Sequence, residues 1–474
     1  TGTPAPERIT PLLGGGSLLI PAEADGRDAV EHWFPARGED GAFALRRVRA
    51  FDISAAPDHV VPEARRRGFL VLDGDGELSI HHTTAERTLL RRRLTTDGIR
   101  ALALSARGDL LLLEDAHGRL QRLEIDNEHP EASFSALFTP VWYEGYAGPT
   151  LSWQSSAAST DAEPKFSLVP LVVGTLKAAL YSMLFAIPVA IFGAIYTAYF
   201  MAPLLRSWVK PTIEIMAALP TVILGFLAGL WLAPIVEREL AAILSFLVLT
   251  PALCIGTGLA LRRFPARLPA SVPDGWQALL MVPLLLAGAA VAAELGPRLE
   301  DWLVGGDLRA WLRERHGIDY EQRNAIVVGI AMGVAVIPVI FTIAEDAIHS
   351  VPKRLAHGAL ALGATRWQTL LRVVLPTASP GIFSALLIGF GRAVGETMIV
   401  LMASGNTPVL GMDPFSGMRT FAANLAVELP ESEVASTHYR ILFLSALVLF
   451  VFTFLVNTVG ELVRQRLRER YGHL

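Results

Sequence analysis

The chain has 474 residues, of which 52% are hydrophobic and 18% are charged, with a formal net charge of -4. Soluble globular chains usually carry more charge, about 25%, so the composition favours a membrane protein. The small net charge argues against a nucleic-acid partner, and the single cysteine, Cys254, excludes an intrachain disulfide.

Residues 1–140 are predicted to form a β-rich domain. Strand-like runs flank Gly26, Gly76 and Gly118, and a glycine at a tight turn between two such runs indicates a hairpin. The turns recur roughly every 40 to 50 residues, which is the period of propeller blades. Three such units cannot close a propeller, so a partial propeller and an unrelated meander both stay open.

No metal or cofactor is expected in this chain. His81 and His82 stand side by side in a strand-like run, and we interpret them as a surface pair and not as metal ligands. The aromatic and small polar residues of 141–165 are typical of a linker. This linker would lead to a membrane domain, 166–474.

The second part of the chain is predicted to be an all-α, polytopic membrane domain. A hydrocarbon core of about 30 Å needs about 20 apolar residues in helical conformation. Seven runs meet or nearly meet this length, at 168–200, 212–235, 240–261, 276–295, 325–344, 381–403 and 439–460.

Lysine and arginine in the connections predict the orientation, because cytoplasmic loops carry an excess of both. The connections 201–211, 262–275 and 345–380 and the tail 461–474 are basic, and they share one side if every run crosses once. We therefore expect a cytoplasmic C-terminus, a periplasmic N-terminal domain and location in a bacterial inner membrane. The loop 296–324 is also basic and disagrees; its stretch "GDLRAWLRERHGI" indicates a short surface helix.

The sixth run contains two charged residues, Arg392 and Glu396, within "GFGRAVGET". If the helix is continuous, their i, i+4 spacing places both on one face. Ionisable residues in a membrane segment are costly and face a bundle interior or a water-filled path. Arginine suits an oxyanion such as phosphate, while an internal ion pair between helices is the structural alternative. Gly389, Gly391 and Gly395 would let helices or a ligand come close.

Glu214, near the start of the second run, is another acid at a membrane boundary. It can cap a helix N-terminus, which the helix dipole favours, or pair with Arg206 or Lys210. A role in a transport path is the weaker interpretation.

The segment 346–376 is helical in pattern, basic and too polar to span a membrane. An apolar stripe is predicted along Ala359, Leu362, Thr365 or Arg366, Thr369 and Val373, because these residues follow a helical period. An amphipathic helix pair of this kind can dock a partner or lie on the membrane, and a plain surface loop is the alternative.

This segment resembles the coupling motif of ABC importer permeases, E-A-A, three residues, G, nine residues, I-x-L-P. Here Gly363 is followed by nine residues and "VVLP", and His357 stands where the family has glutamate. "GRAVGETM", residues 391–398, and "IEIMAALPTVILGFLAGLWLAP", residues 213–234, resemble the phosphate (Pst-type) branch, and the methionine after "GET" resembles its PstC-like subunit. Relative to that family, the runs 240–261 and 276–295 are an added helix pair and the β-rich region is an added domain.

The resemblance implies where function lies in this chain. Substrate contact would fall on Arg392, Glu396 and Thr397. The family also has a membrane helix upstream of its first periplasmic region, which implies that a segment precedes this chain. Coupling to an ATPase would fall on His357, Ala359, Gly363, Ala364, Leu375 and Pro376.

The resemblance further implies the transmembrane subunit of an ATP-driven phosphate importer. Its partners would be a PstA-like permease, two PstB-like ATPase subunits, a PstS-like periplasmic phosphate-binding protein and the lipid bilayer. The chain itself would hydrolyse nothing, because "GGGSLL" lacks the Gly-Lys-Ser/Thr of a phosphate-binding loop; ATP and Mg would bind the ATPase. The alternatives are a permease for another oxyanion and a phosphate-sensing scaffold subunit.

Overall fold

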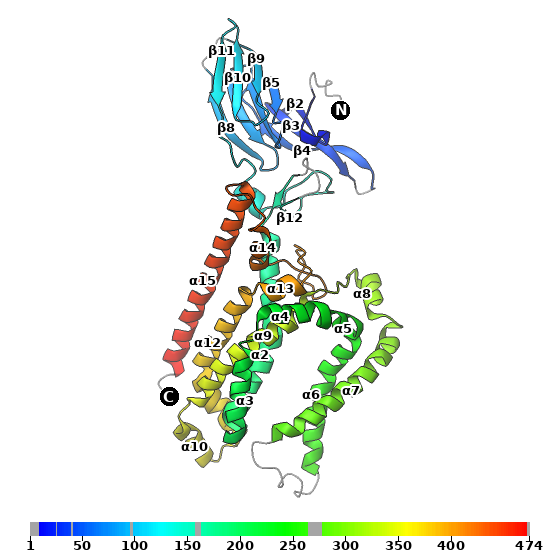
Figure 1. Cartoon of the computed structure of the whole chain (residues 1–474), viewed down its shortest axis with the longest axis vertical. Coiled ribbons are helices and arrows are strands. Elements are labelled where there is room, and N and C mark those ends of the chain that lie inside the picture. Colours follow the sequence, from blue (N-terminus) through cyan, green and yellow to red (C-terminus); the bar gives the residue numbers. More distant parts are fainter. Residues whose placement is uncertain are drawn as a thin grey trace. The chain divides into compact units, whose positions relative to one another are not determined.

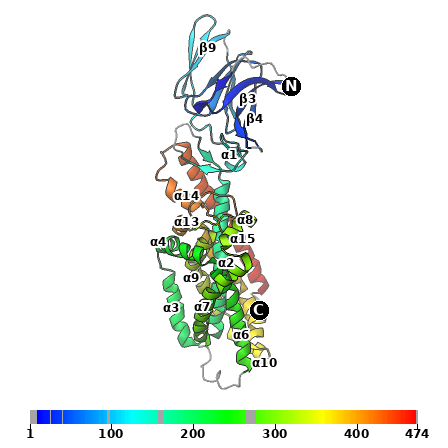
Figure 2. The ribbon, with the colours of Figure 1, turned by 90° about the vertical axis from the view of Figure 1, so that its right-hand side faces the viewer.

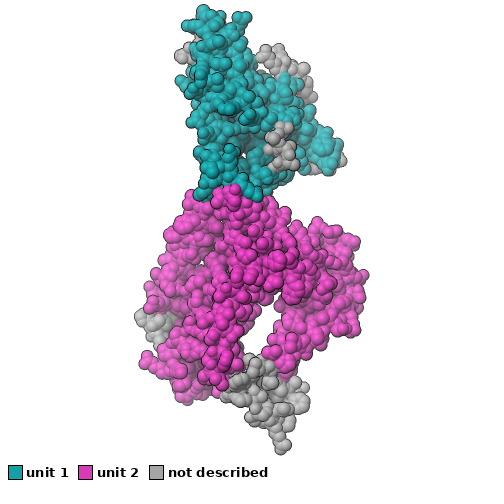
Figure 3. Space-filling model, in the orientation of Figure 1, with its two compact units in different colours: residues 1–170, 431–444 teal, residues 171–430, 445–474 magenta. Residues whose placement is uncertain are grey.

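The structure is a computed structural model that describes residues 9–24, 26–38, 41–94, 98–156, 163–263 and 277–471. The chain forms two compact units (Figure 3). Unit 1 comprises residues 1–170 and 431–444, and unit 2 comprises residues 171–430 and 445–474.

Unit 1 is built from antiparallel sheets whose strands follow chain order (Figure 1). Gly26, Gly76 and Gly118 each have φ of 76°, a left-handed conformation that suits glycine in a tight hairpin. The predicted β-rich domain is confirmed; its likeness to propeller blades stays a prediction. The strands of the three meanders are β1 (Thr10–Pro11), β2 (Leu18–Ala24), β3 (Arg27–Arg37) and β4 (Phe43–Asp52); β5 (Pro57–Pro62), β6 (Gly68–Asp73), β7 (Glu77–His82) and β8 (Arg87–Arg93); and β9 (Ile99–Leu104), β10 (Leu110–Asp115) and β11 (Leu120–Glu124).

The interpretation of His81 and His82 as a surface pair is wrong, because both are buried in unit 1. The His81 ring stacks on Phe69 with ring centroids 5.0 Å apart. Its Nε2 lies 2.8 Å from Ser79 Oγ. Burial lowers the pKa of His81 to about 4 and that of His82 to about 3, in each case helped by nearby arginine. Both side chains are therefore neutral packing residues at pH 7.

Described residues of the segment 141–165, expected as a linker, make regular contacts within unit 1. Val141 pairs with Thr150, and the strand β12 (Trp153–Gln154) pairs with β13 (Lys165–Phe166). Tyr143 and Trp153 are buried. The aromatic residues that resembled a linker composition therefore serve as packing groups, next to the short helix α1 (Phe134–Phe138).

Unit 2 is helical, and among the described residues seven helical segments are long and apolar enough to cross a membrane, as predicted. Figures 1 and 2 show the helices from two directions. They are α2 (Val169–Ile195), η2 (Tyr196–Phe200), α3 (Pro203–Met216), α4 (Thr221–Leu227), η3 (Ala228–Leu232), α5 (Ala233–Arg238), α6 (Leu240–Arg263), α7 (Gln277–Val304), α8 (Leu308–His316), α9 (Ala325–His349), α10 (Lys353–Ala361), α11 (Arg366–Thr369), η5 (Leu370–Val374), α12 (Leu375–Val394), α13 (Met398–Ala403), α14 (Phe421–Glu428) and α15 (Thr437–Tyr471).

Several predicted spans have different bounds in the structure, and in two of them a break between helices explains the difference. The second covers Thr221–Arg238 instead of 212–235, because α3 is a separate helix that ends before Pro220. The sixth covers Arg366–Val394 instead of 381–403, because the helix stops just after Arg392.

The helices α6 and α7, expected as an addition to the family fold, pack chiefly on each other. Gly296 lies against Ala242, where a Cβ would come within 2.5 Å of the Ala242 Cα, and Gly288 lies against Leu253. Most of the basic connection 262–275 lies outside the described residues. The predicted surface helix is confirmed as α8, which begins after an Asp307 cap and ends at Gly317, whose φ is 65°.

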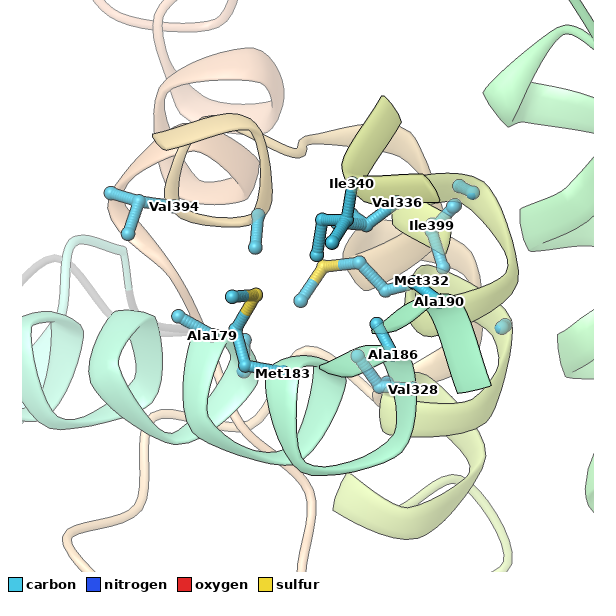
Figure 4. Close-up of a cluster of buried hydrophobic side chains, with 14 of the residues drawn as sticks. Ala179, Met183, Ala186, Ala190, Val328, Met332, Val336, Ile340, Val394 and Ile399 are labelled. Carbon is cyan, nitrogen blue, oxygen red and sulfur yellow. The ribbon is translucent and has the colours of Figure 1, made fainter. Parts of the chain in front are cut away.

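Small residues hold the core of unit 2 together. Ala179, Ala186 and Ala190 of α2 share one buried cluster with Met332 and Val336 of α9 (Figure 4). Glycine lets these helices approach closely. At Gly329 and Gly333 of α9, for example, a Cβ would meet Tyr181 at 2.9 Å and Phe185 at 2.6 Å.

Candidate functional site

The segment "GFGRAVGET" is not one continuous helix. α12 ends at Val394, and α13 begins at Met398, so residues 395–397 form a break. Glycine is a poor helix former, and Gly395 has φ of -86° and ψ of -2°. The prediction that Arg392 and Glu396 share one helix face is therefore wrong.

Arg392 lies in the last turn of α12 and is partly exposed. Within the described parts of the chain, its guanidinium makes no hydrogen bond or ion pair, and none joins it to Glu396. The structure thus does not form the internal ion pair that was the alternative to an anion-contacting role. A partnerless guanidinium beside a helix break has all five donors available for a ligand or a second subunit.

Glu396 and Thr397 form the break itself. The Glu396 carboxylate accepts hydrogen bonds through Oε1 from the backbone N–H groups of Met398, at 3.2 Å, and Ile399, at 3.4 Å. It thereby caps α13 and leaves Oε2 for another donor. The Thr397 hydroxyl donates to the Gly395 carbonyl at 3.4 Å.

The three glycines around Arg392 have different roles. Gly389 is a close helix contact, because a Cβ there would lie 2.5 Å from Ile340 Cγ1. At Gly391 the nearest atom would be Asn457 Oδ1, at 3.7 Å, and at Gly395 it would be backbone at 3.6 Å. Packing inside this chain therefore requires Gly389 but not the other two, and it leaves room beside Arg392.

The residues that flank the break on both ends pack into the core of unit 2. Val394 and Ile399, which flank the break, lie among the buried side chains of α2 and α9 (Figure 4). The helix after the break, α13, also packs closely on α4 and η3. A Cβ at Gly229 of η3 would lie 2.5 Å from the Met402 carbonyl oxygen of α13. The break is thus a fixed structure and not a frayed end.

The predicted coupling residues lie around one tight turn. His357 and Ala359 are in α10, and Gly363 follows with φ of 87°, a conformation that residues with a Cβ rarely adopt. The Ala364 amide donates to the Ala359 carbonyl at 3.1 Å. α11 begins after a capping box between Thr365 and Gln368, and Leu375 and Pro376 open α12.

The turn divides the predicted apolar stripe, so that prediction is wrong. Leu362 is 92% exposed whereas Thr369 is 1% exposed, because the left-handed residue Gly363 reverses the chain between them. α10 has no buried residue. The exposed apolar side chains of this turn are Leu360, Leu362, Trp367 and Leu371.

Both structural interpretations of Glu214 are wrong. It lies in the last turn of α3 and so does not cap a helix N-terminus, and it does not pair with Arg206 or Lys210. Arg206 Nη2 lies 2.5 Å from Oε1 of Glu345, and Lys210 Nζ lies 3.0 Å from Oε2 of the same carboxylate. Glu345 is completely buried, and Lys210 also pairs with Asp346 at 2.5 Å. Two cations hold this buried charge because an unpaired one would be very costly.

Lys177 is a buried cation that the sequence analysis missed. Its Nζ donates to the Ser416 hydroxyl at 2.6 Å, to the Ser416 carbonyl at 3.2 Å and to the Gly417 carbonyl at 3.2 Å. The Gly417 amide donates to Glu321 Oε2 at 2.7 Å. Lys177 therefore ties the loop between α13 and α14 to α2. A lone charge in the first apolar run was the available signal.

Several curated proteins are similar to this chain. The probable ABC transporter permease protein YqgH of Bacillus subtilis is 27% identical over 310 residues, or 65% of this chain and 73% of the relative. The phosphate transport system permease protein PstC 1 of Mycobacterium tuberculosis is 27% identical over 301 residues, 62% and 71% of the two chains. The phosphate transport system permease protein PstC of Xylella fastidiosa is 28% identical over 347 residues, 72% and 88%.

The model of a transporter family covers the greater part of the chain. Residues 186–470 match the binding-protein-dependent transport system inner membrane component. This range includes the tight turn at Gly363 and the helix break at residues 395–397. The chain belongs to this family and is a multi-pass ABC importer permease, resembling the Pst type, with a β-rich N-terminal region.

Proposed function

We propose that this permease is the PstC-like transmembrane subunit of an ATP-driven phosphate importer, with Arg392 as the transient contact of the anion. The main support is the Arg392 guanidinium, which has no protein partner within the described residues and lies beside a fixed helix break. Relatives named as phosphate permeases support the substrate.

Glu396 favours phosphate over an oxyanion that holds no proton. Oε1 is occupied by two backbone amides, and Oε2 could accept a hydrogen bond from hydrogen phosphate. A fully deprotonated dianion would only be repelled by this carboxylate. Thr397, the third predicted contact, adds a hydroxyl at the same break.

The coupling turn would transmit ATP hydrolysis from separate subunits. We infer that two PstB-like ATPases, which hold ATP and Mg, dock on the exposed residues around Gly363, and that a PstA-like permease completes the path. A PstS-like protein would deliver phosphate from the periplasmic side of the membrane. The C-terminus would then be cytoplasmic, in a bacterial inner membrane, as the basic connections predict.

Phosphate uptake by variants tests this function. Charge-assisted hydrogen bonds contribute about 1.5–3 kcal/mol, so Arg392→Ala should reduce phosphate uptake at least tenfold at equal membrane abundance. Arg466→Gln, an exposed arginine of α15, is the matched control and should transport normally. Full uptake by Arg392→Ala would contradict the site.

The two alternatives predict other results in the same membranes. A permease for another oxyanion would take up sulfate or molybdate with the same Arg392 dependence, and phosphate would not compete. A scaffold subunit would assemble with an ATPase without phosphate-stimulated ATP hydrolysis.

A further inference from the structure

Unit 2 contains a cavity that the proposed transport path does not use. Its volume is about 870 Å³, and α3, η2, the end of α9, α10 and the start of α11 line it. Figures 1 and 2 show α3 and α10 at the same end of the unit. Cavities that hold organic ligands measure about 300–1,000 Å³, so this one is far larger than inorganic phosphate requires.

Basic side chains from four helices line this cavity, against one acid, Glu214. Arginine and lysine favour phosphate groups, and arginine can bind them with two parallel hydrogen bonds. The basic lining residues are Arg206, Lys210, His349, Lys353, His357 and Arg366.

Two of these cations are fixed in place before any ligand arrives. Arg206 and Lys210 are 22% and 24% exposed and pair with the fully buried Glu345. Glu345 lies behind the wall and does not line the cavity. Arg206 Nη1 also lies 2.8 Å from His349 Nδ1, and Lys210 also pairs with Asp346. These contacts together do not use all the donors of either cation, so donors remain for a ligand.

The remaining wall is mostly apolar, and exposed apolar side chains lie outside it on α3. Tyr199 and Ile348 are among the lining residues. On the neighbouring face of α3, Leu204, Trp208 and Ile215 are 65%, 73% and 70% exposed. Exposed tryptophan beside basic residues is typical of the membrane interface.

We propose that this cavity binds the headgroup of an anionic phospholipid. The headgroup phosphate would be held by Arg206, Lys353 and Arg366, and an acyl chain would follow the apolar face of α3. Basic pockets at the ends of membrane helices suit such headgroups. The amphiphilic lining favours a lipid over free phosphate. The bound lipid would bridge α3 and α9 to α10, and so stabilise the coupling turn.

Lipid binding to the purified full chain in detergent tests this proposal. Native mass spectrometry with phosphatidylglycerol and phosphatidylcholine should show at least tenfold preference for phosphatidylglycerol. Lys353→Gln should weaken that binding about fivefold, the effect of one cation near an anionic headgroup. Lys353→Arg should restore it.

Arg354→Gln is the matched control, because Arg354 is exposed, follows Lys353 on α10 and does not line the cavity. Equal loss in Lys353→Gln and Arg354→Gln would overturn the site in favour of general surface charge. Displacement of the lipid by millimolar inorganic phosphate would make it a free-phosphate site, and displacement by an ATPase subunit would make it a protein-docking pocket. The assay contains no transport step, so its failure would leave the phosphate function untouched.

Discussion

Glu396 makes a structural contact within the chain, and Arg392 makes none among the described residues. The Glu396 carboxylate caps the first amides of α13, and this contact helps end α12 before the second half-helix begins. Arg392 makes no comparable contact within the described chain. Substitution of Glu396 should therefore affect both stability and transport, whereas substitution of Arg392 should affect transport alone.

Two substitutions at Glu396 separate its structural role from its charge. Glu396→Gln keeps an oxygen that can accept both backbone hydrogen bonds, so the melting temperature should stay within about a degree. Glu396→Ala removes the cap and should cost about 1 kcal/mol. Thermal unfolding of both purified variants checks this. Equal destabilisation by the two substitutions would show that charge, and not hydrogen bonding, holds the break.

The sequence identified the charged residues of the candidate site, but it did not predict how they lie relative to each other. "GRAVGETM" marks Arg392 and Glu396, yet their i, i+4 spacing predicted a shared helix face. The side-chain cap on α13 is a contact between nearby residues whose formation depends on the break itself. Lys177 was missed for a related reason: its three acceptors come from residues some 240 positions away.

At the scale of the elements, the tight turn between α10 and α11 depends on the conformation of Gly363. Its φ of 87° reverses the chain between α10 and α11 and leaves Leu362 exposed. Gly363 stands at the glycine position of the sequence motif, and its left-handed conformation explains why that position suits glycine. A helical period over the same residues predicted a stripe instead, because periodicity alone does not detect a left-handed residue.

Gly363→Ala should destabilise the turn by about 1–2 kcal/mol, the cost of a left-handed conformation with a Cβ. The expected result in the proposed complex is ATP hydrolysis with reduced phosphate uptake. Gly358→Ala is the matched control, because Gly358 is helical and a Cβ there meets nothing within 4 Å. Measuring uptake per ATP hydrolysed compares the two; an identical ratio would contradict the role of the turn.

At the scale of the whole molecule, unit 1 carries a pH dependence of its own. Burial lowers the pKa of His32 to about 3, with help from Arg49, and the pKa values of His81 and His82 are lowered similarly. Below pH 6.5 the unfolded state binds protons that the folded state does not, so stability falls as pH falls. Burial also raises the pKa of Glu163 to about 7. Between pH 4.5 and 7 the folded state therefore holds a proton that the unfolded state does not, so this group adds stability as pH falls.

Three histidines outweigh one glutamate, so acidification from pH 7 to 4.5 should destabilise unit 1. Each fully titrating histidine contributes about 1.4 kcal/mol per pH unit. Hydrogen exchange, corrected for its intrinsic pH dependence, should show lost protection in β3, β6 and β7. α9 and α12 of unit 2 are the internal control. Unchanged protection in the strands would show that these histidines are protonated in the folded state.

The sequence alone determined the seven membrane-spanning segments, the β-rich N-terminal region and the family. These features depend on apolar length, turn glycines and short motifs, all of which are local. The tertiary structure decided where the sixth helix breaks, that Arg392 has no partner among the described residues, and which cations Glu345 holds. Those outcomes depend on packing and charge pairing between distant segments, because burying a charge is tolerated only where a partner meets it.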